Sequence, residues 1–295
     1  MGMNWVAAAG LLLACTVAAP AMAATATAAE HQRACAGHDG WADPAPPVRV
    51  FGQVYDVGTC GITVLLLRGD KGDILIDTGP ADAAPAVARN LRRLGIRKGD
   101  IKLMLATHEH FDHVGGMAAL QRQTGATIRL TPAASAVLRR GSVAPGDPQA
   151  GSIDPPPVAK VGEPLADGEV VRLGRLALTV HFTPGHSPGG SSWTWRACEG
   201  AVCRSIVYAD SLSAVSRKGY RFSDHPDRVA ALRRSFATVG ALPCDILITP
   251  HPGASDLFPR LYGARPLVDP GLCRAYAEEA RRNLDARLAA ERRSR

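Results

Sequence analysis

Aromatic residues are scarce in this chain, and its later part has no long apolar run. Phe, Trp and Tyr make up 5% of the 295 residues. Beyond residue 25, no segment supplies the roughly 18 uninterrupted apolar residues that a membrane-spanning helix needs. A nucleic-acid surface combines basic residues with interleaved aromatics, so a net charge of +7 does not by itself indicate such a partner. We therefore expect no nucleic-acid partner and no stable membrane association of the mature chain.

The composition is otherwise that of a globular protein. Hydrophobic residues make up 46% of the chain and charged residues 21%, which supports a buried core and excludes disorder. Much of the positive charge lies in the helical pattern near the C-terminus, where a basic face is usually solvated. No apolar surface patch is apparent, so we expect a monomer.

Residues 1–23 contain no charged side chain. Residues 6–19 form an apolar run of the length found in signal peptides, and Ala21-Met22-Ala23 is a small-x-small cleavage site. We expect an export signal over residues 1–23, cleaved near Ala23, and a periplasmic mature protein. Two alternatives stay open: a lipoprotein signal, because Leu13-Ala14-Cys15 resembles a lipobox, and a buried N-terminal helix.

The cysteines lack the C-x2-C spacing of a zinc knot. Setting Cys15 aside leaves six of the seven cysteines, which allow 15 pairings. An oxidising compartment favours disulfides over free thiols. Proximity in the sequence favours three pairs, Cys35–Cys60, Cys198–Cys203 and Cys244–Cys273, the second closing a hairpin tip.

The hydrophobic pattern alternates short strands with amphipathic helices and shows no linker. Residues 24–45 read as an irregular arm, and the Gly- and Pro-rich residues 141–157 as a long loop of the kind that often serves as a lid. We predict helices at 81–94, 116–122, 132–140, 226–239 and 272–292. We predict strands at 48–57, 62–68, 73–77, 101–106, 127–130, 170–173, 176–183, 191–196, 205–208 and 245–249. This pattern predicts one domain over residues 24–295, an α/β sandwich with two sheets inside and helices outside.

One short segment concentrates the chemistry, Thr107-His108-Glu109-His110-Phe111-Asp112-His113. It follows the strand predicted at 101–106, where catalytic loops are commonly built. On an extended loop, His108 and His110 converge on one ion, while Asp112 and His113 turn to a second. We expect Glu109 to point away as a structural residue. The segment is not the H-E-x-x-H motif, because Asp112 stands where that motif has its second histidine.

Two further histidines lie in loops that follow predicted strands. His186 lies in a Pro- and Gly-rich loop at residues 183–190, and His251 lies between Pro250 and Pro252. Imidazoles and a carboxylate without thiolates suit zinc, and two ions about 3.5–4 Å apart share a bridging hydroxide. We interpret the remaining histidines as ordinary residues: His31, His38, His181 and His225.

The H-x-H-x-D-H motif with two distant histidines resembles the metallo-β-lactamase superfamily. The resemblance implies a four-layer αβ/βα sandwich and gives Asp77, in Asp77-Thr78-Gly79, the role of bracing the metal loop. In detail the sequence is most similar to the third subclass of class B. For two Zn²⁺ per chain, that subclass implies His108, His110 and His186 on the first ion and Asp112, His113 and His251 on the second.

The same resemblance implies an activity and substrate contacts. Ser211 stands where the first subclass has a cysteine ligand. Ser211 and Ser213 would face the β-lactam carboxylate, or else satisfy their own loop, and Gln149 would contact the substrate. The implied reaction is zinc-dependent hydrolysis of the β-lactam amide of penicillins, cephalosporins and carbapenems, which confers antibiotic resistance. A zinc-bound hydroxide oriented by Asp112 would be the nucleophile.

Other functions remain possible within the same superfamily. In a hydroxyacylglutathione hydrolase-like thioester or lactone hydrolase, Asp210 would bridge both metals, although export argues against a glutathione-linked pathway. The nuclease branch carries an extra domain for which this chain has no room. A periplasmic zinc-binding protein without enzymatic activity would be expected to lose at least one ligand.

Overall fold

The computed structural model describes residues 1–2 and 27–293. The predicted signal peptide is therefore almost entirely outside the described residues, as are its cleavage site and Cys15. Within the described ranges, no helix is long and apolar enough to cross a membrane.

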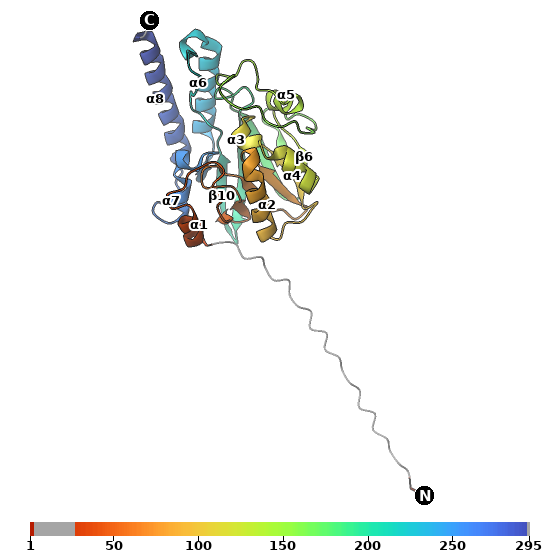
Figure 1. The fold of residues 1–295 in the computed structure, drawn as a ribbon. Coiled ribbons are helices and arrows are strands. Elements are labelled where there is room, and N and C mark those ends of the chain that lie inside the picture. The colour runs from red at the N-terminus through yellow and green to blue at the C-terminus, as the bar shows by residue number, and fades with distance from the viewer. Residues whose placement is uncertain (3–26, 294–295) are drawn as a thin grey trace.

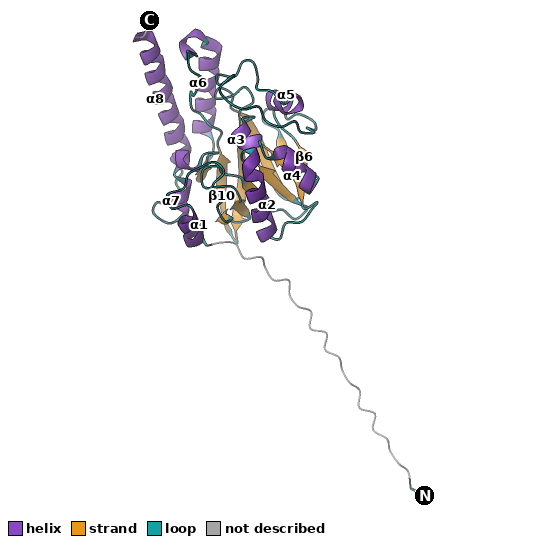
Figure 2. Cartoon of the chain, in the orientation of Figure 1, coloured by secondary structure: helices purple, strands orange, loops and turns teal. Residues whose placement is uncertain are grey.

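Two mixed sheets form the centre of the protein (Figure 2). In the first sheet β1 to β4 are antiparallel, while β4, β5 and β6 run parallel. Its order is β1 (Val48–Phe51), β2 (Val54–Asp56), β3 (Leu65–Leu67), β4 (Asp73–Ile76), β5 (Ile101–Leu105) and β6 (Thr127–Ile128). In the second sheet only β10 and β11 are parallel. Its order is β11 (Ile246–Ile248), β10 (Val202–Tyr208), β9 (Ser191–Glu199), β8 (Leu176–Phe182) and β7 (Val170–Leu173).

Helices cover the outer face of each sheet, and Figure 1 shows the two groups on opposite sides. The first sheet is covered by α2 (Ala84–Arg93), α4 (Met117–Thr124) and α5 (Pro132–Arg140). The second is covered by α6 (Pro226–Ala241) and α8 (Leu272–Arg293). Strands buried on both faces read as continuous apolar runs. In β3, for example, Leu66 packs toward the helices, whereas Leu65 and Leu67 pack between the sheets.

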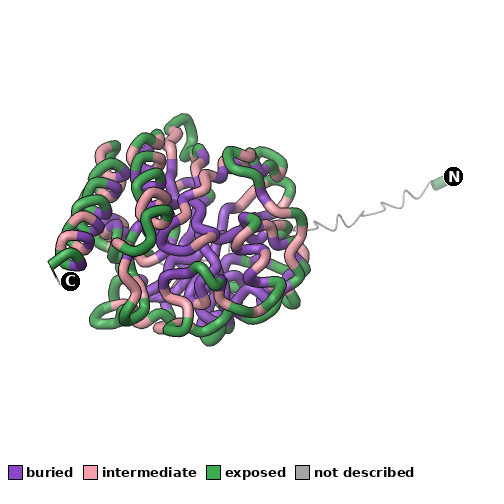
Figure 3. The backbone as a smooth tube through the Cα atoms, turned by 90° about the horizontal axis from the view of Figure 1, so that it is seen from above, coloured by how far each residue is buried: buried purple, intermediate pink, exposed green. Residues whose placement is uncertain are grey.

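Apolar clusters fill all three interfaces between these layers. Between the sheets, Trp193 and Tyr208 are fully buried against the first sheet. Outside the second sheet, Phe236 and Leu284 come from α6 and α8. In Figure 3 the central segments of the backbone are buried, while much of the outer part of the molecule is exposed. This arrangement confirms the predicted four-layer αβ/βα sandwich.

The prediction of an irregular arm over residues 24–45 was wrong for part of that segment. Residues Ala28–Ala34 form the helix α1, which begins with a capping box between Thr27 and Glu30. The helix is fixed by packing, because His31 is buried and its Nδ1 lies 2.7 Å from the hydroxyl of Tyr262. Tyr262 directly follows the short helix α7 (Leu257–Leu261), which the sequence pattern also missed.

Some strand boundaries also differ from the prediction. The strand expected over 48–57 is a hairpin, because Gly52 takes a φ of +56° and turns the chain between β1 and β2. Strands β9 and β10 extend beyond their predicted ends to a tip closed by Cys198–Cys203. The other disulfides join Cys35 to Cys60 and Cys244 to Cys273, so all three pairs are those favoured by sequence proximity.

Candidate metal centre

The candidate site lies where several strands end. His108 and His110 follow β5, Ser211 follows β10 and His251 follows β11, while His186 lies in the loop between β8 and β9. The parallel pairing of β10 with β11 brings their carboxyl ends to one edge of the second sheet. The short helix α3 (Phe111–Val114) places Asp112 and His113 beside His108.

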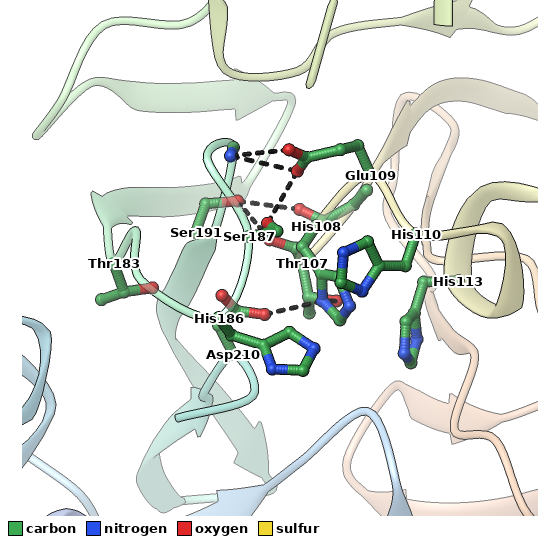
Figure 4. A network of polar contacts seen from close by, with 12 residues as sticks. Thr107, His108, Glu109, His110, His113, Thr183, His186, Ser187, Ser191 and Asp210 are labelled. Atoms are coloured by element: carbon green, nitrogen blue, oxygen red, sulfur yellow. Dashed lines mark hydrogen bonds and ion pairs between the residues drawn. The ribbon is translucent and has the colours of Figure 1, made fainter. Parts of the chain in front are cut away.

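Three buried imidazoles converge on one point. One nitrogen from each of His108, His110 and His186 lies within 4.8 Å of the others. The ring centroids of His108 and His110 are 4.6 Å apart, and each lies 4.9 Å from that of His186. Figure 4 shows these rings turned toward one another.

The outward-facing nitrogen of each ring has its own hydrogen-bond partner. His108 Nδ1 lies 2.8 Å from Asp210 Oδ1, and His186 Nδ1 lies 3.0 Å from the carbonyl oxygen of Ser213. His110 uses its other nitrogen, since Nε2 lies 2.8 Å from Asp147 Oδ2. A carboxylate or carbonyl accepts a hydrogen, so each contact assigns the proton to the outer nitrogen and leaves the inner lone pair for a metal.

A second group adjoins the first. Ligand atoms of His108, Asp112 and His113 also lie within 4.8 Å of one another. Asp112 Oδ2 is 3.1 Å from His113 Nε2 and 3.4 Å from His251 Nε2. The rings of His113 and His251 have centroids 5.0 Å apart. All six histidine and aspartate side chains expected at the two ions are therefore neighbours.

Burial and neighbouring charges shift the pKa values of His108, His186 and Asp112. Burial lowers the pKa of His108 well below its usual range and that of His186 to about 3, so both rings are neutral. Burial alone would raise the pKa of Asp112, but the adjacent His113 and His251 outweigh it and hold the pKa below its usual range. Neutral imidazoles and an ionised carboxylate are the states in which these side chains bind metals.

Buried polar atoms without partners test whether a metal fits. Several buried polar atoms of the described residues make no contact with the geometry of a hydrogen bond, and three of them belong to the two groups: His108 Nε2 and both nitrogens of His113. Such orphaned groups carry a desolvation cost unless something else satisfies them. A divalent cation at each group would satisfy His108 Nε2 and one of the two His113 nitrogens, and nitrogen and oxygen donors without thiolates are those that zinc accepts.

Comparison with known proteins agrees with this geometry. The family described as "Metallo-beta-lactamase superfamily" matches residues 57–251. The chain belongs to the metallo-β-lactamase superfamily. The resemblance predicted from the histidine motif is thereby confirmed.

Similar solved structures place the chain near one subclass of this superfamily. MIM-1 from Novosphingobium pentaromativorans is 49% identical with a TM-score of 0.88, and the match covers 90% of this chain and 98% of that one. MEM-A1, a subclass B3 metallo-β-lactamase from a soil metagenome library, is 45% identical with a TM-score of 0.83, over 87% and 100% of the two chains. SMB-1, solved with 2-mercaptoethanesulfonate, is 44% identical with a TM-score of 0.83, over 85% and 99%. The chain is thus a metallo-β-lactamase of the B3 type.

Curated relatives match over a shorter region. The hydroxyacylglutathione hydrolase of Anaeromyxobacter dehalogenans (strain 2CP-C) is 36% identical over 139 residues, which are 47% of this chain and 43% of that protein. The chain spans less than half the length of this and of two other curated relatives, so the similarity covers only part of each protein.

Asp210 lies behind the metal-facing residues of this metallo-β-lactamase. Its Oδ1 accepts the hydrogen of His108 Nδ1. Its Oδ2 points to Gly190, where a Cβ atom would lie only 2.3 Å away. Asp210 belongs to neither metal-binding group found in the described part of the chain. Its geometry is that of a residue that orients His108, not of a carboxylate that bridges two ions.

Two other carboxylates fix the loops that carry the ligands. Glu109 points away from the imidazoles, as expected, and accepts hydrogen bonds from Ser187 Oγ at 2.8 Å and from the Gly189 amide at 2.9 Å (Figure 4). It thereby ties the His108 loop to the His186 loop. Asp77, at a φ of +64°, accepts hydrogen bonds from the amide of Thr107 at 2.7 Å and from its hydroxyl at 2.9 Å.

Two of the three expected substrate contacts, Ser211 and Ser213, line one cavity. Ser211, Ser213 and His251 line a cavity of about 390 Å³ whose opposite wall is α8. Ser213 Oγ also lies 3.1 Å from His186 Nδ1. Gln149 lies in the long loop 141–157, where its backbone amide donates to Asp147 Oδ1.

Sequence reasoning missed two residues beside the metal centre. Asp147 contacts His110, but its position in a loop rich in Gly and Pro gives no sign of this. Trp41 is 45% exposed, and its ring centroid lies 5.5 Å from that of His251 and 5.8 Å from that of Phe111. The sequence around Trp41 has no pattern that would have placed this tryptophan beside the metal centre.

Proposed function

We propose that this B3-type metallo-β-lactamase hydrolyses the amide bond of β-lactams, including penicillins, cephalosporins and carbapenems, with two zinc ions. The observation that carries the proposal is the convergence of three buried imidazoles beside a second group centred on an ionised aspartate. The similarity to MIM-1 and MEM-A1 over nearly the whole described chain supports it. Activity of this kind would confer antibiotic resistance.

The proposed ligands fall into two sets. His108, His110 and His186 would hold the first ion, and we call this set the first metal site. Asp112, His113 and His251 would hold the second. Zinc ions held there would supply a Lewis acid for the lactam carbonyl and lower the pKa of the attacking water to about 7.

The chain's own residues have separate tasks in the reaction. Asp112 is ionised, so it accepts a hydrogen bond from the attacking water and orients it. His186 Nδ1 donates its hydrogen to Ser213, which leaves the Ser213 hydroxyl hydrogen available to a substrate. Ser211 and Ser213 would donate to the β-lactam carboxylate from the wall of the adjoining cavity. Gln149 would contact the substrate from the long loop.

The test is hydrolysis of a carbapenem and of a chromogenic cephalosporin by the purified protein. Turnover that EDTA removes and zinc restores is the expected result. We expect His110→Ala and Asp112→Ala each to lower kcat/KM at least 10²-fold while the fold is retained. His38→Ala is the matched control, because His38 is exposed and pairs with Asp43. Lack of turnover by the zinc-loaded protein would contradict the proposal.

A thioester or lactone hydrolase is the second candidate, favoured by the partial similarity to hydroxyacylglutathione hydrolases. A hydroxyacylglutathione thioester assayed in parallel separates the two. If the thioester is turned over and the β-lactams are not, the second candidate replaces the first.

We also propose export to the periplasm and a monomeric mature protein. Three disulfides support an oxidising compartment. N-terminal sequencing of the protein from a periplasmic fraction tests for cleavage after Ala23, and light scattering gives the oligomeric state.

A further inference from the structure

Asp147 has a fully buried carboxylate in a loop without helix or strand. Its side chain is 0% exposed, and its Oδ2 lies 2.8 Å from His110 Nε2. Its Oδ1 accepts the amide hydrogen of Gln149 at 2.7 Å. Its own amide donates to the carbonyl of Ala144 at 3.0 Å. Both carboxylate oxygens and the backbone of Asp147 are therefore engaged at once.

His110 needs this partner because its ring is turned differently from the other two rings. His108 and His186 hydrogen-bond through Nδ1 and present Nε2 to the first metal site, whereas His110 hydrogen-bonds through Nε2 and presents Nδ1. The hydrogen bond to Asp147 fixes this tautomer and ring orientation. Without it, a buried N–H would be left unsatisfied, and the ring could turn away from the site.

The loop around Asp147 is held on two sides. On one side, the guanidinium of Arg228 donates to the carbonyl of Gly146, and the amide of Arg217 donates to the carbonyl of Pro148 at 3.0 Å. These contacts come from α6 and from the segment that precedes it. On the other side, Asp147 connects the loop to the proposed metal ligands through its hydrogen bond with His110. Gln149, the proposed substrate contact, lies two residues further along.

We infer that Asp147 is a positioning residue that couples the loop 141–157 to the first metal site. It holds His110 with Nδ1 toward the metal, and in return metal binding at that site holds the loop and Gln149 in one position. The inference rests on the proposed zinc ligands, and the coupling is reciprocal because it is a free energy shared by two equilibria.

The first experiment measures zinc affinity by competition with a chromogenic chelator. We expect Asp147→Ala to weaken the binding of one of the two zinc ions by about 10- to 100-fold, as loss of a partner behind a ligating histidine typically does. Asp147→Asn keeps an acceptor for the Nε2 hydrogen, so it should lose less. Asp154→Asn is the control, because Asp154 is an exposed acid in the same loop and should bind zinc like the wild type.

The second experiment measures hydrogen exchange of residues 144–152 with and without zinc. In the wild type and in Asp154→Asn, zinc should slow exchange in this segment at least several-fold. In Asp147→Ala the segment should exchange at the same rate in both states. Circular dichroism checks folding, and if Asp147→Ala does not fold, Asp147→Asn carries the comparison.

Two results would overturn the inference. One is zinc affinity of both Asp147 variants within twofold of the wild type. The other is a wild-type loop whose exchange does not respond to zinc. Neither measurement uses a substrate, so a failure of β-lactam hydrolysis with intact zinc coupling would count against the proposed function alone.

Discussion

Replacing Tyr208 by Phe tests the network that holds the two metal loops together. The Tyr208 hydroxyl is fully buried and lies 2.7 Å from Asp77 Oδ2 and 2.9 Å from the carbonyl oxygen of Thr63. Asp77 in turn holds Thr107, the neighbour of His108, and the amide of Thr63 donates to the carbonyl of Pro250, the neighbour of His251. One hydroxyl thus connects the segments on either side of the metal centre.

The structure gives the size of the expected effect. Phe keeps the ring and its packing between the sheets, so the loss is the hydroxyl hydrogen bond to a buried carboxylate, about 1.5–3 kcal/mol. Asp77 retains both hydrogen bonds from Thr107, so we expect about 2 kcal/mol. For a protein of this size that corresponds to a Tm lowered by about 4–8 °C.

Urea unfolding of the EDTA-treated and zinc-loaded forms is the assay. The network contains no proposed metal ligand, so the free energy of unfolding should fall by the same amount in both forms. The slope of that free energy against urea concentration should not change. Tyr276→Phe is the matched control, since its hydroxyl hydrogen-bonds to uncharged backbone groups of Asp210 and Leu212, and it should cost about 1 kcal/mol. If Tyr208→Phe costs less than about 0.5 kcal/mol, or no more than the control, the network does not stabilise the site as argued.

Two further predictions concern pH dependence and substrate binding. Burial lowers the pKa of His31 from 6.5 to about 4, so between these pH values the unfolded chain binds a proton that the folded protein excludes. The free energy of unfolding should therefore fall as the pH drops from 6.5 toward 4, by up to about 3 kcal/mol, and urea unfolding of His31→Gln should lack this slope; an identical slope in the variant would show that other groups cause it. For the proposed β-lactam substrates, Ser213→Ala should raise KM more than it lowers kcat, because the backbone carbonyl of Ser213 still holds His186. Steady-state kinetics with a carbapenem measure both constants, and an unchanged KM would remove Ser213 from substrate binding.

The sequence by itself determined the features that depend on short stretches of chain. Strands and helices follow from hydrophobic spacing, because each buries a continuous face, and the four-layer sandwich follows from their order. The segment 107–113 places histidines and aspartate within a few residues of a strand end, so their proximity needs no long-range contact. The hydrophobic pattern did not predict α1, because this helix has a weak apolar pattern. It is stabilised by the burial of His31 against Tyr262, which is 231 residues away.

Only the tertiary structure decided which groups stand behind the metal-facing rings. Asp147, Asp210 and Ser213 contact their histidines across 37, 102 and 27 residues, and no periodicity or motif links such distant positions. These contacts decide which ring nitrogen carries the proton, so they also decide that His110 presents Nδ1 while His108 presents Nε2. The sequence alone also allows Asp210 to bridge two metals. In the structure, its carboxylate oxygens face His108 and Gly190 instead. The ligand types can be recognised from short motifs of this chain, whereas their orientation arises from contacts between segments that are distant in the sequence.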